Sequence, residues 1–176
     1  MQEKDVLTYE QFPLIISITA ILISLLIYLL GAYILLGFGI LVSIIFILYC
    51  VGVEFLVLTR SCIHCYYYGK ICGLGKGKIC ALFFKKGDPK KFTTKQVQWY
   101  HLIPDFLTFI IPLIGGLIIL YINFSWFILV AMILILILSI GGNTVIRGYY
   151  ACKFCKQRIL GCSAQQLFNK KKKDAK

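Results

Sequence analysis

The stretch PLIISITAILISLLIYLLGAYILLGFGILVSIIFILYCVGVEFLVL, residues 13–58, decides the fold, because Glu54 is its only formally charged residue. About 18 apolar residues in a row are typical of a membrane span, and this stretch is more than twice that long. A second stretch, residues 106–146, contains no Asp, Glu, Lys or Arg. Each stretch is long enough for two helices and a turn. The sequence therefore predicts an all-α integral membrane protein with four transmembrane helices, at about 13–33, 36–58, 103–122 and 125–146.

The composition supports the same class of protein. Of the 176 residues, 60% are hydrophobic and only 15% are charged, whereas about a quarter of the residues of a soluble domain are charged. A cleaved signal peptide does not account for the first apolar stretch, because residues 1–11 carry three acidic side chains where a signal peptide has a basic start. We expect lipid to surround most of the chain.

Two helical hairpins would place residues 1–12, the loop 59–102 and the tail 147–176 on one side of the membrane. These segments carry one, nine and nine Lys or Arg residues, which together are all 19 in the chain. The positive-inside rule assigns the basic side to the cytosol. We therefore expect a multi-pass protein of the cell membrane whose N-terminus, loop and C-terminus are cytosolic. The membrane accounts for the net charge of +12, so no nucleic-acid partner is predicted.

One cysteine pattern occurs twice. Cys62-Ile-His-Cys65 and Cys152-Lys-Phe-Cys155 each continue through six further residues to another cysteine, Cys72 and Cys162 respectively. Each hairpin is also preceded by Tyr-x-x-x-Pro, at residues 9–13 and 100–104. The pattern predicts two tandem repeats, residues 1–102 and 103–176, related by an axis along the membrane normal. That symmetry would bring the two cysteine triads together beneath the helices.

Thiols in the cytosol are kept reduced, which favours metal or redox chemistry over structural disulfides. Two C-x2-C knuckles can complete a tetrahedral zinc site, either as one ion on four thiolates or as a binuclear cluster. An iron–sulfur cluster also takes four thiolates, and Cys80 would be an extra ligand in the first half. Thiol–disulfide redox chemistry, or thiols with no ligand, remains a third interpretation. Cys50 lies inside the second helix, where packing is its expected role.

The paired C-x2-C-x6-C triads resemble the binuclear zinc cluster of fungal zinc-cluster transcription factors. The resemblance implies that six thiolates hold two zinc ions, with Cys62 and Cys152 bridging both metals and Cys65, Cys72, Cys155 and Cys162 as terminal ligands. It covers about eleven residues in each copy. Two membrane spans separate the triads here, where that family has a short loop, and DNA binding is not implied.

Three further features bear on function. The glycine-rich stretch 69–77 has the wrong spacing for a phosphate-binding loop, so we expect it to wrap closely round a metal cluster, followed by a short interfacial helix at 81–86. His64 has no equivalent in the second copy and is interpreted as a spacer. The run Lys170–Lys173 would suit anionic lipid headgroups or a solvated tail.

Two carboxylates lie near the bilayer surface. Intramembrane carboxylates are often functional, but Glu54 and Asp105 are shallow enough to pair with Arg60 or Arg147.

No catalytic motif is visible, so enzyme activity is unsupported. The sequence thus favours a zinc-stabilised scaffold or subunit that docks a protein partner or a second copy, with an iron–sulfur electron carrier or a small ion or metal transporter as alternatives.

Overall fold

The computed structural model describes residues 8–94 and 99–162. The lysine run Lys170–Lys173 lies outside the described residues. Within them the chain is helical, and its β-structure is limited to one isolated bridge between Tyr9 and Cys155. The expected all-α class is confirmed.

Four helices are long and apolar enough to cross a membrane, as the sequence predicts. The first three are α1 (Leu14–Leu35), α2 (Ile40–Arg60) and α5 (Ile103–Ile122). The fourth begins as α6 (Trp126–Leu136) and continues through two π-helical stretches, η4 (Ile137–Gly142) and η5 (Thr144–Cys152).

The end of the fourth span differs from the prediction. It was expected near residue 146, but the helical path continues to Cys152. Ile146 and Ala151 are buried, and Gly73 of the first loop packs against Ala151, so this last segment is held by tertiary contacts. Arg147 and Cys152 therefore lie on a helix, not in a free tail.

The turn regions agree with the expected ones. A short 3-10 turn, η1 (Leu36–Phe38), is followed by Gly39, whose φ of 115° strongly favours glycine. Asn123 and Ser125 flank the other reversal and both adopt extended backbone angles.

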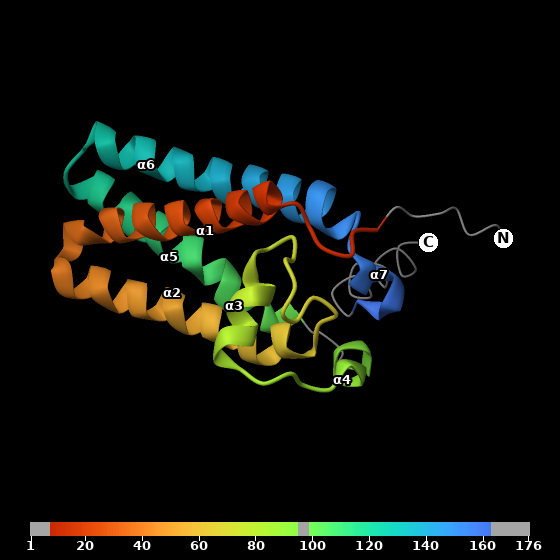
Figure 1. Cartoon of the computed structure of the whole chain (residues 1–176). Helices are drawn as coiled ribbons and strands as arrows, with labels where there is room; N and C mark the ends of the chain where they lie inside the picture. Colours follow the sequence, from red (N-terminus) through yellow and green to blue (C-terminus); the bar gives the residue numbers. More distant parts are fainter. Residues whose placement is uncertain (1–7, 95–98, 163–176) are drawn as a thin grey trace, which may run out of the picture.

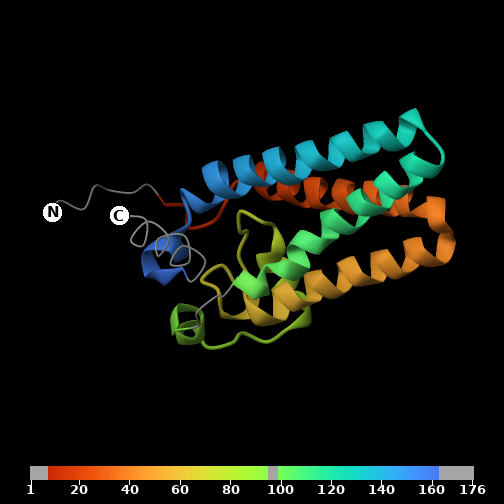
Figure 2. The same ribbon diagram turned by 180° about the vertical axis from the view of Figure 1, so that it is seen from behind.

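The first helix lies at the centre of the bundle and packs against α2, α5 and α6 (Figures 1 and 2). Two clusters of buried side chains form the core, one around Phe46 and Cys50 and the other around Ile34 and Ile135. Close approach depends on glycine: a Cβ on Gly31 would stand 2.8 Å from the Phe46 ring of α2 and 3.1 Å from Pro112 of α5. Small residues at helix crossings are typical of packing in membranes.

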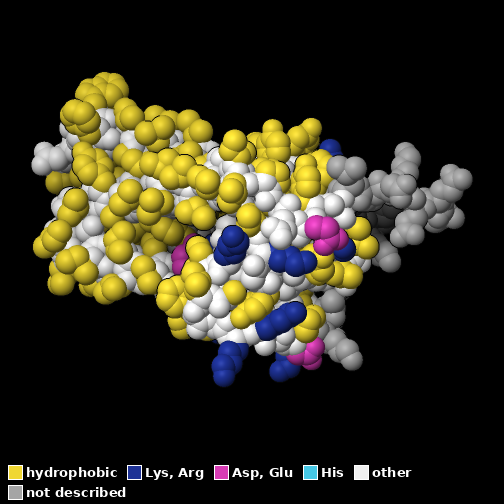
Figure 3. Space-filling model, in the orientation of Figure 1, with side chains coloured by type: hydrophobic (Ala, Val, Ile, Leu, Met, Phe, Trp, Pro, Cys, Tyr) yellow, Lys and Arg dark blue, Asp and Glu magenta, His cyan; other side chains and the backbone are white. Residues whose placement is uncertain are grey.

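The outer surface of the bundle is apolar. Only 22% of the residues in each spanning window are buried inside the protein, and large side chains such as Ile15, Leu48 and Phe127 are mostly exposed. In Figure 3 hydrophobic side chains cover one end of the molecule, and Lys, Arg, Asp and Glu gather at the other. Such a surface requires lipid around it, because monomeric soluble proteins rarely expose large apolar patches.

The short elements lie together at the end of the bundle that carries the charges, which we call the polar end (Figure 1). They are η2 (Cys62–His64), α3 (Lys76–Phe83), α4 (Pro89–Thr94), η3 (Trp99–His101) and α7 (Lys156–Gly161). The expected interfacial helix at 81–86 is shifted: α3 begins at Lys76 and ends at Phe83. Gly75, with φ of 73°, precedes it and permits the early start.

Candidate functional site

Seven of the eight cysteines lie at the polar end. Cys50 is buried within the bundle, as expected for a packing residue. Cys62 and Cys65 lie in and just after η2, Cys72 precedes α3 and Cys80 is inside it. In the second half, Cys152 ends η5, while Cys155 and Cys162 flank α7. All eight are free thiols.

The two cysteine segments contact each other directly. The backbone N–H of Tyr66 donates to Oε1 of Gln157 at 2.8 Å, which joins the first segment to α7. The N-terminal strand-like segment also reaches the second one, because the Tyr9 N–H donates to the Phe154 carbonyl at 3.1 Å. Residues about 90 positions apart in sequence are therefore neighbours at the polar end.

Tyr67 connects three segments through one hydroxyl. It donates to the Tyr9 carbonyl at 2.6 Å and accepts from the Lys156 backbone N–H at 3.0 Å. Its side chain is 2% exposed, and its ring contacts that of Phe12. Sequence patterns did not identify this role of Tyr67. The repeated Tyr-x-x-x-Pro motif was the available signal that Tyr9 belongs to the same arrangement.

A charged group on the surface holds the same three segments together and was not predicted. The carboxylate of Glu10 contacts Lys156 and Tyr66, and lies 3.8 Å from Lys70. Hydrogen bonds from Lys156 and Tyr66 hold the pKa of Glu10 below its ordinary value. The side chain is exposed, so its ion pairs orient the segments more than they stabilise the fold.

The thiols of the two segments affect each other electrostatically. Burial, together with the neighbouring thiols of Cys155, Cys72 and Cys162, raises the pKa of Cys65 to about 12. Burial also raises the pKa of Cys155 to about 11. Such groups are neutral thiols at pH 7, and they are poor nucleophiles until a cation compensates the charge of the thiolate.

Backbone N–H groups point at several of the sulfurs. Gly77 N–H donates to the Cys72 Sγ at 3.3 Å. The backbone N–H of Tyr67 lowers the pKa of Cys65, and those of Gln157 and Arg158 lower the pKa of Cys155, each against the larger effect of burial. Hydrogen bonds of this kind favour the charged thiolate, which is the form that binds metal. Cys65 and Cys155 occupy matching positions of the two triads and share this feature.

The thiols are not gathered at metal-ligand spacing. Among residues 8–94 and 99–162, no three His, Cys, Asp or Glu side chains lie close enough together to hold one ion. Cys62 has Cys72, Cys80 and Cys65 as its electrostatic neighbours, whereas Cys152 has Cys162. The described thiols are spread over both cysteine segments and do not form one compact cluster, and Cys65 lies where the two segments meet.

The glycine-rich stretch packs closely against the first cysteine segment. A Cβ on Gly77 would collide with the carbonyl oxygens of Tyr67 and Lys70. His64 packs beside Gly87, and its Nδ1 is buried without a hydrogen-bond partner. Gly77 therefore brings backbone against backbone near Cys72, whereas the expected role of the stretch around a metal cluster stays a prediction.

The carboxylates near the bilayer have cationic partners. Glu54 lies 2.5 Å from Lys76 Nζ and accepts a 2.7 Å hydrogen bond from Tyr28. Its partner is thus a residue of α3, not Arg60 or Arg147 as expected from sequence. Asp105 lies 3.7 Å from Arg147. Sequence could not anticipate Lys76, because the fold of the glycine-rich loop brings it back against the helices.

Comparisons of the chain with protein-family profiles, with curated proteins and with solved structures find no match.

Proposed function

We propose that this protein is a membrane-embedded scaffold whose polar end binds zinc through the cysteines of the two triads. The single observation that supports the proposal is that the two triads are neighbours, because the backbone N–H of Tyr66, next to Cys65, donates to Oε1 of Gln157, which lies between Cys155 and Cys162 in sequence. Buried thiols from separate segments lose their protons when a divalent cation binds, and the cation compensates the charge of the thiolates that form.

The donor chemistry fits zinc. Zinc takes four thiolates in a tetrahedron, and the backbone N–H groups at Cys65, Cys72 and Cys155 would stabilise those thiolates. Cys62, Cys152 and Cys162 complete the expected set of ligands, and Cys80 is the possible extra ligand. Binding requires the thiols to move closer, so the energy of binding would order the loops and join them. The protein would then present a fixed cytosolic surface to a partner.

Metal content tests the proposal. The full chain, purified anaerobically in mild detergent, is expected to contain one or two zinc ions per chain by elemental analysis and to be colourless. Cys65→Ala and Cys155→Ala should each remove most of the zinc, whereas Cys50→Ala in the bundle should leave it unchanged. Retention of full zinc content by both triad variants would overturn the proposal.

The same preparation distinguishes zinc from the alternative of an iron–sulfur cluster. A brown protein with visible absorption and stoichiometric iron would show that the thiols hold an iron–sulfur cluster and not zinc. Electron transfer would then be the function. Cys80, the extra ligand of that alternative, is fully buried and donates to the Leu58 carbonyl.

The transporter alternative has less support. Glu54 and Asp105 each contact a cation, so each charge is compensated within the protein. Ion pairs of this kind are sufficient to hold carboxylates at shallow depth.

A further inference from the structure

We propose that α3 inserts one face into the surface of the bilayer beside α2 and binds anionic phospholipid headgroups through the lysines next to that face. The partner is the lipid of the leaflet at the polar end. The contact would fix the first cysteine segment at the membrane surface, because α3 follows Cys72 and contains Cys80. It is independent of whether the thiols bind zinc.

The two sides of α3 differ in exposure. Gly77 and Cys80, three residues apart, are buried on the inner side. Ile79, Leu82 and Phe83 are exposed, and Leu82 and Phe83 reach 81% and 74%. Residues three and four apart share one side of a helix, so these three side chains form one apolar surface, which we call the outer face of α3. Such a surface is unfavourable in water and requires a partner.

Contacts on the inner side hold α3 against the end of α2. The Sγ of Cys80 donates to the Leu58 carbonyl at 3.8 Å. The ring of Phe84, which directly follows α3, lies 5.2 Å from the ring of Phe55. Because α2 ends at Arg60, both contacts fall within its last two turns. The outer face of α3 therefore lies at the level where α2 approaches the membrane surface.

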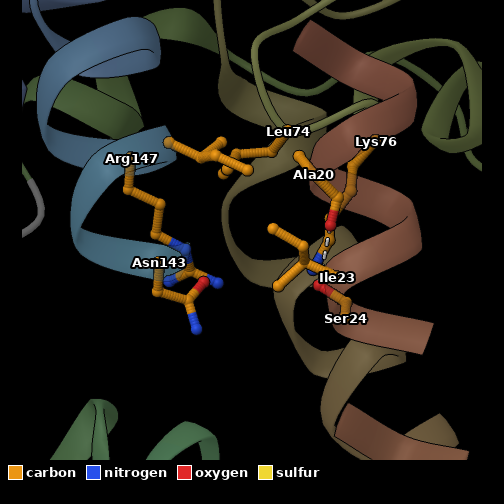
Figure 4. Close-up of a pocket in the computed structure, with 8 residues that line it drawn as sticks. Ala20, Ile23, Ser24, Leu74, Lys76, Asn143 and Arg147 are labelled. Atoms are coloured by element: carbon orange, nitrogen blue, oxygen red, sulfur yellow. Dashed lines mark hydrogen bonds between the residues drawn. The ribbon is translucent and has the colours of Figure 1, made fainter. Parts of the chain in front are cut away.

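The beginning of α3 is held inside the bundle. Lys76, its first residue, pairs with Glu54 of α2. Figure 4 shows Lys76 and Leu74 at the recess that Ile23 of α1 and Arg147 of the fourth span also line. The helix is thus fixed at its start and along its inner side, and the outer face is left at the edge of the bundle.

The outer face adjoins a surface that lipid covers. Phe55 and Leu56 of α2 are exposed and belong to the apolar outer surface of the bundle. Phe84, the neighbour of Phe83 in sequence, packs on Phe55. A protein that covered the outer face of α3 would have to displace lipid from α2 as well. This continuity favours the bilayer as the partner.

The charges beside the outer face favour anionic lipid. Lys78, Lys85 and Lys86 are exposed, and the sequence of α3 contains no acidic residue. Within the part of the chain that the structure describes, none of the three forms an ion pair, in contrast to Lys76. An apolar helix face with lysines next to it is typical of helices that lie in the membrane interface and attract anionic headgroups.

Photo-crosslinking of the full chain tests the proposal. Phe83 is replaced by p-benzoylphenylalanine, and the protein is irradiated in lipid nanodiscs made from equal parts of phosphatidylglycerol and phosphatidylcholine. Mass spectrometry should find lipid adducts at position 83, with more phosphatidylglycerol than its share of the bilayer. Lys86→Gln should lower that preference by up to about fivefold, the effect of one basic residue near an anionic surface.

Matched controls use the same crosslinker and the same charge change elsewhere. In place of Leu48, an exposed residue of α2 inside the spanning region, it should give lipid adducts without preference for phosphatidylglycerol. In place of Lys91, exposed on α4, it should give few, because α4 lies beyond α3 at the polar end (Figures 1 and 2). Lys91→Gln should leave the lipid preference at position 83 unchanged.

Three results would overturn the proposal. Crosslinks from position 83 to a second copy of the chain would show that protein covers the outer face. Lipid adducts as rare at position 83 as at position 91 would show that the face does not enter the bilayer. The same ratio of the two lipids at positions 83 and 48 would show that the lysines do not select anionic headgroups.

Discussion

Tyr67 occupies a position where one oxygen atom serves the N-terminal segment, the first cysteine segment and α7 at once. It is both a donor and an acceptor, and its ring is almost completely buried. Two hydrogen bonds therefore depend on a single group that has no access to water. A buried group of this kind contributes more when lost than an exposed one, because its partners remain unsatisfied.

Replacing Tyr67 by Phe should lower the free energy of unfolding by about 1–3 kcal/mol, since the Tyr9 carbonyl and the Lys156 N–H lose their partner. Thermal unfolding in detergent measures the change. Tyr149→Phe, at an exposed tyrosine, is the matched control and should be neutral. Equal stability of Tyr67→Phe and the unmodified protein would show that the hydroxyl has no structural role.

The thiol of Cys155 should alkylate slowly in the metal-free protein. Its pKa is raised from 9.0 to about 11 by burial, so its thiolate fraction at pH 8 falls about a hundredfold. The rate should rise with pH up to about 11, and mass spectrometry of alkylated peptides measures it.

The same shift has a defined sign for stability. A pKa raised in the folded state stabilises the metal-free fold below about pH 9, and that contribution is lost as pH rises toward 11.

For the alkylation experiment, protein unfolded in dodecyl sulfate is the control, and its Cys155 should alkylate at the ordinary thiol rate. Fast alkylation of the folded protein at pH 8 would contradict the assigned burial.

Glycines set the distances between the spanning helices. Gly31 faces both Phe46 and Pro112, so α1 approaches α2 and α5 at the same level. Pro112 is itself inside α5 and almost fully buried there, where helix-breaking residues are tolerated by packing. The centre of the bundle therefore depends on the absence of a side chain at one position of α1.

Gly31→Val should destabilise the bundle by about 1–3 kcal/mol, because the added atoms overpack the Phe46 ring. Gly52→Val, on α2 with open space around it, introduces the same residue without a collision and should cost less than about 1 kcal/mol. Unfolding by dodecyl sulfate, followed by circular dichroism, compares the two. A similar loss in both would point to helix propensity instead of packing.

Sequence predicted the elements better than their contacts. The spans follow from hydropathy and length, which are properties of each segment alone and are fixed by the thickness of the bilayer. The end of the fourth span was misplaced, because the burial of Ala151 by Gly73 is a tertiary effect. The Glu54–Lys76 pair was missed for the same reason: no local pattern says which loop residue returns to which helix.

For the candidate site, spacing identified the cysteines and the glycine-rich stretch. It did not identify Tyr67 or Glu10, whose roles depend on partners 89 and 146 positions away. The distances between the sulfur atoms depend on how each side chain is placed, and the spacing of the cysteines in the sequence does not give those distances. Convergence of the two segments was expected from the repeat, whereas the spacing of individual sulfurs was not.

At the scale of the molecule, charge and apolar surface are separated along one axis. Hydrophobic side chains cover the bundle, and charged side chains gather at the polar end (Figure 3). The ion pairs of Glu10 and seven of the eight thiols also lie at that end. This separation, with all 19 Lys and Arg outside the far turns, is what supports the proposed cytosolic orientation.

Orientation can be measured with two introduced cysteines. A membrane-impermeant maleimide added to intact cells should label Phe124→Cys, at the far turn, and should label Lys85→Cys at the polar end only after permeabilisation. Both side chains are exposed, so accessibility within the protein is matched. The reverse labelling pattern would show that the polar end faces the outside of the cell. The thiols would then lie in an oxidising compartment, where a reduced metal site is disfavoured.

The hydrogen bond between Tyr9 and Phe154 has a consequence for biosynthesis. Ribosomes release the N-terminal segment first, at about 5–20 residues per second, so the Tyr9 N–H must wait for its acceptor until all four spans have been made. Residues 8–12 can bond to the first cysteine segment earlier, but closure of this end cannot be completed before translation passes Lys156. The last step of maturation therefore joins the oldest part of the nascent chain to one of its youngest.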